Sequence, residues 1–464
     1  MNKLLINKRN IAPIQKVIID AASFHFEQQY GPHKVIEYTV NWKYKDLNLY
    51  FHIIKAVIFF IIKSRKLSNI INYSIEGVNI GLPAFSTAMR TFKVYDSKIF
   101  LYYSVFKQLI SAVRMYFFST KIIKESQINS EELVVYIDDI AYLNSILFDS
   151  LMKSEVGVYT NKYPHGYMLY KNKKHTQISS AKYEYPKINE SEEKYHDYME
   201  KRLTNPLDFI PYLNADISVK IKKYKPKMAN AQTVLIYPHS FTDAQLVYGY
   251  DGFLNMYEWL EFTLDVLIDK NVNIIVKGHP NYWAKNYESE VIEWDLKLWN
   301  RLQKKYNTNK YVEFIDFPVS NKDQLDSLDP KNTVVISHHG NAAVEAAYLG
   351  FKSISSSCSI WGNEYYSFCE TWSTREEYKE ILCNLQSIEY PNAVKLKNFV
   401  SDRYMYKYAY HGKFMLLSIV SREIGIPIKD LITAPSLVTI DTVSYTHLRA
   451  HETPEHLVCR LLLE

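Results

Sequence analysis

The chain has 464 residues, which is enough for two or three domains of about 150 residues each. Hydrophobic residues make up 47% and charged residues 23%, so the composition excludes a wholly disordered chain, and four cysteines exclude a disulfide scaffold. The formal net charge of +5 is unevenly divided, because residues 1–228 carry 33 Lys and Arg against 21 Asp and Glu, whereas residues 229–442 carry 20 against 26. A basic first half is expected to meet an anionic partner, such as a membrane surface or a phospholipid-linked glycan. No dense basic run or nucleic-acid-binding motif indicates a nucleic acid.

The first 125 residues are predicted to form a strand followed by mainly helical structure. Residues 16–20 (KVIID) are a short apolar run, and residues 44–125 are rich in Phe, Tyr, Ile and Lys. The longest apolar stretch, Leu49–Ile62, includes His52 and Lys55 and is shorter than the roughly 20 residues that span a bilayer. It fits a helix that is buried in a core or lies at a membrane interface.

Residues 132–160 predict one β-α-β unit. ELVVYIDDI has the pattern of a buried strand, AYLNSILFDSLMKS that of an amphipathic helix, and VGVYTN that of a second strand. A polar stretch with a solvated helix at residues 191–203 follows. Residues 220–231 are charged and aperiodic, which is typical of a linker. We therefore expect an N-terminal domain at residues 1–223, a linker at 224–231 and a C-terminal domain at 232–442.

The second half alternates strands and helices. Strands are predicted at residues 233–237, 272–277, 311–316, 333–337 and 351–357, with helices at 256–269, 290–306 and 341–349, and one or two final helices at 394–425. This alternation favours a doubly wound parallel sheet, so the fold class is α/β.

The last 22 residues, 443–464, have no usable hydrophobic period. They resemble a translated sequencing adapter, and we leave them out of the fold prediction. The N-terminus lacks an apolar stretch of signal-peptide length. The expected location is therefore cytoplasmic, with peripheral contact at the inner face of the membrane.

The strongest candidate for a binding site is Val334–Gly350 (VVISHHGNAAVEAAYLG), where a strand runs into a helix through a polar turn. A helix N-terminus offers unpaired backbone N–H groups and partial positive charge, which suit a phosphate. Gly340 would let a phosphate approach the backbone, and Glu345 could accept from ribose hydroxyls. A plain strand-turn-helix remains the alternative. The polar residues of the turn are Ser337, His338, His339, Gly340 and Asn341.

A second candidate is IIVKGHPN, again at the carboxyl end of a strand. Pro280 stiffens the turn that carries His279, whose imidazole could donate to a phosphate, and Lys277 adds a positive charge nearby. Ligands of open α/β sheets bind at the carboxyl ends of strands, where both candidates lie. An ordinary surface turn is the alternative.

Two carboxylate-bearing turns are candidates for catalysis. PHSFTDA places His239, Ser240 and Asp243 after the first strand of the second half, where Asp243 could equally stabilise a helix N-terminus. Asp138 and Asp139 end the strand LVVYI, where a carboxylate could act as general base or nucleophile, or cap the next helix. The cysteines lack CxxC spacing, and no metal site is predicted.

The run Tyr237–Leu260, together with VKGHPN and SHHGNAAVEAAYLG, resembles the donor half of bacterial capsule and surface-polysaccharide glycosyltransferases. This resemblance implies the GT-B architecture, two Rossmann-like domains facing each other across a cleft. The His-Pro pair is similar to that of transferases using CMP-activated sialic acid or Kdo. The likeness places His279, Pro280 and Ser337 at nucleotide-binding positions and Glu345 at a ribose or base contact. Many relatives carry Gly-Thr where this chain has His-His-Gly-Asn.

The resemblance implies a transferase that moves a sugar from a nucleotide-activated donor to a capsular or other surface glycan, free or lipid-linked. The nucleotide sugar is a substrate, and neither a metal nor another cofactor is expected. Asp139 is the first choice for the catalytic carboxylate, followed by Asp138 and Asp243. Three alternatives remain open: a teichoic-acid-type polyol-phosphate transferase, an isomerase similar to UDP-GlcNAc 2-epimerase, and a non-catalytic accessory of polysaccharide export.

Overall fold

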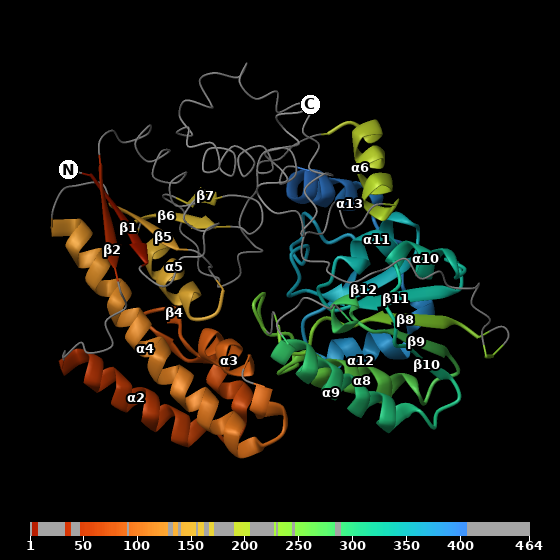
Figure 1. Cartoon of the computed structure of the whole chain (residues 1–464), viewed down its shortest axis with the longest axis horizontal. Coiled ribbons are helices and arrows are strands. Elements are labelled where there is room, and N and C mark those ends of the chain that lie inside the picture. Colours follow the sequence, from red (N-terminus) through yellow and green to blue (C-terminus); the bar gives the residue numbers. More distant parts are fainter. Residues whose placement is uncertain are drawn as a thin grey trace. The chain divides into compact units, whose positions relative to one another are not determined.

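The structure is a computed structural model that describes residues 2–7, 33–38, 47–90, 92–128, 133–137, 141–154, 156–161, 167–170, 190–204, 227–228, 231–243, 246–283 and 289–405. The chain divides into two compact units, residues 1–180 with 406–464 and residues 181–405 (Figure 1). The predicted linker lies largely outside the described residues, so the predicted domain bounds stay a prediction. The segments 16–20, 406–425 and 443–464 also lie outside them.

The first unit is built on a five-stranded sheet in the order β2-β1-β5-β6-β7. Its first four strands are parallel and β7 is antiparallel to β6. This is the strand order of flavodoxin-like sheets. The strands are β1 (Asn2–Asn7), β2 (His33–Tyr38), β5 (Leu133–Ile137), β6 (Gly157–Asn161) and β7 (Tyr167–Tyr170), and a separate hairpin pairs β3 (Ser74–Ile75) with β4 (Val78–Asn79).

Helices make up most of the first unit between β2 and β5, as the composition predicts. They are α2 (Leu47–Lys63), η1 (Leu67–Asn72), α3 (Gly81–Met89), η2 (Phe92–Tyr95) and the 31-residue α4 (Lys98–Ile128), followed by α5 (Asn144–Lys153) after β5. The predicted β-α-β unit is confirmed, because β5 and β6 pair in parallel with α5 between them. α4 packs against α2, α3 and α5. Its neighbour α2 is not a core helix, since only Leu49 and Ala56 are buried there.

The second unit holds a six-stranded, fully parallel sheet in the order β10-β9-β8-β11-β12-β13. Counted along the chain this is 3-2-1-4-5-6, the order of Rossmann domains. Every residue of β8, β9 and β11 is buried, which explains their continuous apolar runs. The strands are β8 (Thr233–Tyr237), β9 (Asn273–Lys277), β10 (Val312–Ile315), β11 (Thr333–Ser337), β12 (Lys352–Ser356) and β13 (Glu370–Trp372).

Helices cover both faces of this sheet, with α8, α9 and α12 on one face and α6, α10, α11 and α13 on the other (Figure 1). The helices are α6 (Glu192–Thr204), α8 (Met256–Leu267), α9 (Ser289–Tyr306), α10 (Asn321–Asp326), α11 (Ala342–Tyr348), α12 (Arg375–Cys383) and α13 (Ala393–Phe399), with shorter turns η4 (Pro280–Trp283), η5 (Leu385–Ser387) and a π-helix η6 (Val400–Met405). α6, predicted as a solvated helix, packs on α10, α11 and η6.

Local capping explains where several of these helices begin. Side chains of Asn255, Ser320, Thr374 and Asn392 each accept a hydrogen bond from the backbone N–H three residues later. α11 differs, because Asn341 at its start makes no such bond. No helix in the described part of the chain is long and apolar enough to cross a membrane.

Candidate functional site

The strand order of the second unit determines where a ligand would bind. Successive strands are added toward one edge of the sheet from β8 to β10 and toward the other edge from β11 to β13, so the strand order reverses between the parallel neighbours β8 and β11. Open α/β sheets bind ligands in the crevice at this switch point, beyond the carboxyl ends of the strands. Histidines gather at these ends. His239 follows β8, His279 follows β9, and the pair His338 and His339 follows β11 directly.

These imidazoles form one cluster in space. The ring centroid of His239 lies 4.5 Å from that of His339 and 5.5 Å from that of His279. Burial lowers the pKa of His239, although the negative charge of Asp243 partly opposes it, and burial lowers the pKa values of His279 and His339 well below the usual range. All three rings are therefore neutral at pH 7. A neutral imidazole keeps one N–H group, which can donate to an anionic oxygen without the cost of burying a free cation.

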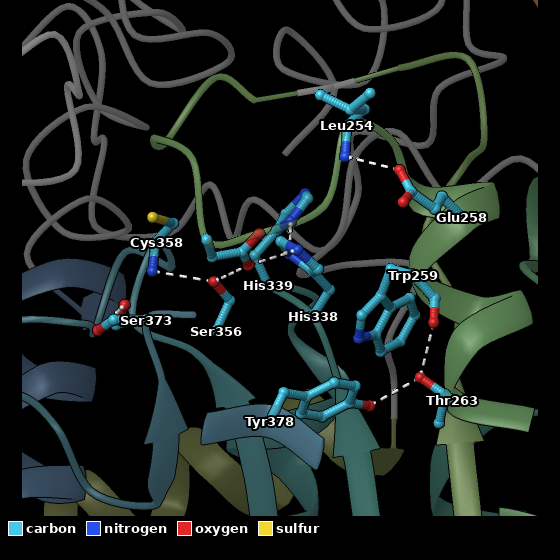
Figure 2. Close-up of polar contacts among 12 residues, drawn as sticks. Leu254, Glu258, Trp259, Thr263, His338, His339, Ser356, Cys358, Ser373 and Tyr378 are labelled. Carbon is cyan, nitrogen blue, oxygen red and sulfur yellow. Dashed lines mark hydrogen bonds and ion pairs between the residues drawn. The ribbon is translucent and has the colours of Figure 1, made fainter. Parts of the chain in front are cut away.

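Asp251 anchors this cluster from a loop between β8 and α8. Its Oδ2 atom lies 2.8 Å from Nε2 of His338 and accepts a hydrogen bond from the Ser356 hydroxyl. Figure 2 shows His338, His339 and Ser356 close together at this point. Burial alone would raise the pKa of Asp251, but the charge of His338 and the hydrogen bonds from His338 and Ser356 outweigh it and hold this pKa below its usual value. Gly252 allows the loop to run close to the first residue of α12, because a Cβ at this position would lie 2.5 Å from the backbone nitrogen of Arg375.

The pair Asp251 and His338 acts on His339 through a hydrogen bond between imidazoles. The Nδ1 atoms of His338 and His339 are 2.9 Å apart, so one of them carries the shared proton and the other accepts it. A protonated His338 donates to both neighbours and leaves the proton of His339 on Nε2. A neutral His338 accepts at Nδ1, and the Nε2 atom of His339 is then an acceptor. Within the described residues this buried Nε2 atom has no hydrogen-bond partner.

The hydrogen-bonded series Asp251–His338–His339 therefore ends at Nε2 of His339, which is a donor or an acceptor depending on the position of one proton. Sequence reasoning found both histidines but missed Asp251. Its signal in the sequence is the spacing GYDG, an aspartate between two glycines with positive φ. From the sequence alone this loop indicates only an ordinary turn, and the tertiary structure shows that it lies beside β11 and β12.

Lys277 and Glu345 belong to a second buried network. The Nζ atom of Lys277 donates to Oδ1 of Asn321 at 2.8 Å, and Nδ2 of Asn321 donates to Oε2 of Glu345 at 2.7 Å. Burial lowers the pKa of Lys277 to about 8, and the charge of Glu345 opposes this only in part. Lys277 also lies 5.3 Å from the ring centre of Tyr237.

The other carboxylate oxygen of Glu345 accepts from Nε of Arg202 on α6 at 3.1 Å, and both side chains are 4% exposed. Both oxygens of Glu345 thus have protein partners. Its predicted contact with a ribose or base stays a prediction. Sequence reasoning missed Arg202, because it lies 143 residues earlier in the chain, on a helix with no motif.

The start of α11 is more enclosed than the sequence predicts. Ser337 is 1% exposed, and its hydroxyl donates to the backbone carbonyl of Tyr237 at 3.3 Å. Asn341 accepts a hydrogen bond from the hydroxyl of Tyr404. At Gly340, a Cβ would lie 2.9 Å from Oγ of Ser337, so this position favours glycine for space. α11 has only seven residues, and the predicted phosphate contact at its start remains a prediction.

The turn after β8 is held by Asp295, a residue of α9 that sequence reasoning also missed. Asp295 is 3% exposed and accepts hydrogen bonds from the hydroxyls of Ser240 and Thr242 at 2.6 and 3.0 Å and from the backbone nitrogen of Phe241 at 3.0 Å. Burial raises its pKa to about 7 despite these bonds. Ser240 is therefore tied to α9.

Of the remaining predicted residues, Pro280 opens η4, whose Tyr282 donates from its hydroxyl to the backbone carbonyl of His239 at 3.1 Å. Asp243 lies in the described turn after β8. Asp138 and Asp139 lie outside the described residues, so their catalytic role stays a prediction. Among the residues that the structure describes, no three His, Cys, Asp or Glu side chains are grouped so that they could hold a metal ion.

No protein-family model matches the chain, and no curated protein matches its sequence. Among solved structures, it is similar to a β-Kdo 2,4 transferase, KpsC of Thermosulfurimonas dismutans, at 11% identity and a TM-score of 0.33, over 60% of this chain and 81% of that chain. It is also similar to Anabaena HepE in complex with UDP-glucose, at 11% identity and a TM-score of 0.27, over 91% of this chain and all of that one.

A third similar structure is the UDP-GlcNAc 2-epimerase of Methanocaldococcus jannaschii, at 13% identity and a TM-score of 0.24, over 86% of this chain and 98% of that chain. Scores of this size carry no argument about substrate. The strand orders of the two sheets themselves show a two-unit α/β fold.

Proposed function

We propose that this chain is a nucleotide-sugar-dependent glycosyltransferase whose second unit binds the donor. The observation that carries the proposal is the place of the histidine cluster. His239, His279 and His339 gather at the carboxyl ends of β8, β9 and β11, at the switch point of a sheet with Rossmann strand order. This is where such sheets bind nucleotides, and neutral imidazole N–H groups suit the oxygens of a phosphate.

In the proposed reaction, the imidazoles stabilise the negative charge that develops on the leaving nucleoside phosphate when the glycosidic bond to the sugar breaks. His279 and His339 are the proposed hydrogen-bond donors to the phosphate, and Lys277 adds positive charge below about pH 8. The proposed acceptor is a hydroxyl of a capsular or other surface glycan, free or lipid-linked. Asp139, then Asp138 and Asp243, are the proposed carboxylates for the acceptor side.

We propose a CMP-linked donor as the first to test, on the strength of the His-Pro pair alone. Ligand binding to the folded state raises the melting temperature, by several degrees when the ligand is at about 100 times its dissociation constant. A thermal-shift series with CMP, CDP, UDP and GDP therefore identifies the nucleotide part of the donor. Incubation of the matching nucleotide sugar with a glycan acceptor should then release the nucleotide and extend the glycan.

Each other outcome of that series has a meaning. No shift with any nucleotide overturns the proposal. Turnover of CDP-glycerol in place of a nucleotide sugar supports a polyol-phosphate transferase. Conversion of a UDP-sugar without any acceptor supports an isomerase, and binding without turnover supports an accessory protein.

A further inference from the structure

An apolar stripe covers the outer side of α2 in the first unit. Seven large apolar side chains of this 17-residue helix are 50–88% exposed: Leu47, Tyr50, Phe51, Ile54, Ile58, Ile61 and Ile62. Their spacing of mostly three or four residues places them on one face. The opposite side packs on α4, where the ring centre of Phe60 lies 5.3 Å from that of Phe106.

The stripe continues onto the first turns of α4, which runs beside α2 (Figure 1). Ile99, Phe100 and Tyr103 are 81%, 50% and 61% exposed. The ring centre of Tyr102 lies 6.5 Å from that of Phe60, so these turns lie next to the carboxyl end of α2. We call the exposed apolar residues of α2 and of the start of α4 the α2–α4 face.

The charges around this face are mainly positive, although two exposed carboxylates, Glu76 and Asp96, adjoin it. Residues 47–75 and 97–124 together contain nine Lys and Arg and no Asp or Glu. Eight of the nine are exposed: Lys55, Lys63, Arg65, Lys66, Lys98, Lys107, Lys121 and Lys124. An apolar face with a mainly basic border matches a bilayer whose headgroups are anionic.

A hollow of about 490 Å³ opens beside the same face. Its lining includes Lys55, Ile58 and Ile62 of α2, and Tyr73 and Glu76 complete the far side. The face is therefore not flat, and it has a recess with Lys55 and Glu76 on its border.

We propose that the α2–α4 face binds an anionic lipid bilayer, with its apolar side chains at the level of the acyl chains and its Lys and Arg residues against the headgroups. α2 lies in the plane of the interface, because His52 and Lys55 interrupt its apolar residues and its 17 residues are short for a span. A second copy of the chain is the poorer occupant, because a two-fold contact would bring the basic borders of both copies together, and the nine Lys and Arg residues of each far outnumber the adjoining carboxylates Glu76 and Asp96. This inference goes beyond the proposed transferase and does not depend on it.

The test is vesicle flotation with the full chain, without nucleotide or acceptor. Vesicles of phosphatidylcholine alone are compared with vesicles containing about 30% phosphatidylglycerol. We expect the protein to float only with the anionic vesicles, and less at high salt because screening weakens headgroup attraction. Equal flotation with both vesicles, or none with either, overturns the proposal.

Two variants separate the parts of the surface. The triple change Ile54→Ser, Ile58→Ser and Ile61→Ser removes apolar contact, and the triple change Lys63→Gln, Arg65→Gln and Lys66→Gln removes charge. Each should weaken binding to anionic vesicles about tenfold or more. The altered side chains are exposed, so the melting temperature should not fall.

A matched control changes Tyr390→Ser and Val394→Ser, two exposed apolar residues of the second unit that are 56% and 69% exposed. Vesicle binding should be unchanged. If the isoleucine variant lowers the melting temperature and the wild type does not float, the face is covered within the chain or by a second copy, and the proposal is wrong. Because flotation needs no nucleotide, its failure leaves the donor-binding test unaffected.

Discussion

The Nε2 atom of His338 lies 2.8 Å from Oδ2 of Asp251, and both side chains are buried beside the carboxyl ends of β11 and β12. Because the other ring nitrogen of His338 contacts His339, this pair determines which hydrogen-bonding role His339 can offer a ligand. A buried carboxylate that orients a histidine is a positioning group and does not itself contact the substrate.

Replacing Asp251 by Asn tests this relay. We expect the rate of sugar transfer to fall about 10- to 1,000-fold, because the neutral amide no longer fixes the proton on the two imidazoles. A double-mutant cycle is the decisive measurement. If Asp251 acts through His339, Asp251→Asn should have little further effect on the rate in a His339→Ala background. Additive losses would mean that Asp251 has only a structural role.

Replacing His279 by Ala tests the phosphate contact. The donor KM should rise or kcat should fall by a combined factor of about 10 to 1,000, which corresponds to a loss of about 1.4–4 kcal/mol of transition-state stabilisation. The thermal shift given by the cognate nucleotide should shrink in parallel. His196→Ala is the matched control. This exposed histidine is on α6, which packs on α10 and α11, and it is not part of the histidine cluster. Unchanged kinetics in His279→Ala would remove this residue from the site.

Replacing Glu345 by Gln distinguishes two roles of this residue, its ion pair with Arg202 and its predicted contact with a ribose. The change leaves the buried charge of Arg202 without its counter-ion, so we expect the second unit to lose about 3 kcal/mol of stability. Denaturant unfolding measures this loss. The double variant Arg202→Met with Glu345→Met should recover part of it, because the unpaired charge of Arg202 is removed. A higher donor KM at unchanged stability would instead support the ribose contact.

Asp149 on α5 gives a pH dependence of stability in the first unit. Burial raises the pKa of this carboxyl to about 7, and its Oδ1 atom has no hydrogen-bond partner among the described residues. The folded state therefore holds a proton that the unfolded state releases near pH 4, so stability from this group is full below pH 4 and falls as pH rises to about 7.

Asp149→Asn removes this dependence. The melting temperature of the wild type minus that of the variant should fall between about pH 4 and about pH 7. Asp197→Asn on the exposed side of α6 is the control, and its difference from the wild type should stay nearly constant. A difference for Asp149→Asn that does not change with pH would contradict the raised pKa.

Local pattern was enough to predict much of the second unit. The strands β8, β9 and β11 are uninterrupted apolar runs, and the helices between them have a period near 3.6, so both could be recognised from neighbours in sequence. The positions of His239, His279 and His339 after three of these strands followed directly. The same reasoning predicted β5, α5 and β6.

The hydrogen-bond partners of these residues could not be predicted in this way. Arg202 and Glu345 are separated by 143 residues, and Ser240 and Asp295 by 55. Nothing in the local sequence of α6 or α9 marks one residue as a buried partner, because that depends on which helices cover which face of the sheet. The exposure of α2 was equally undecided, since an apolar helix has the same period whether its stripe faces a core or a lipid surface.

By itself, the sequence determined the order of strands and helices along the second unit and the histidines at the strand ends, because hydrophobic period and turn residues are short-range signals. Only the tertiary structure decided that β8 and β11 are neighbours, that Asp251 reaches His338, and that the α2–α4 face is left exposed. Strand order depends on long-range burial of both sheet faces, and no local pattern encodes it.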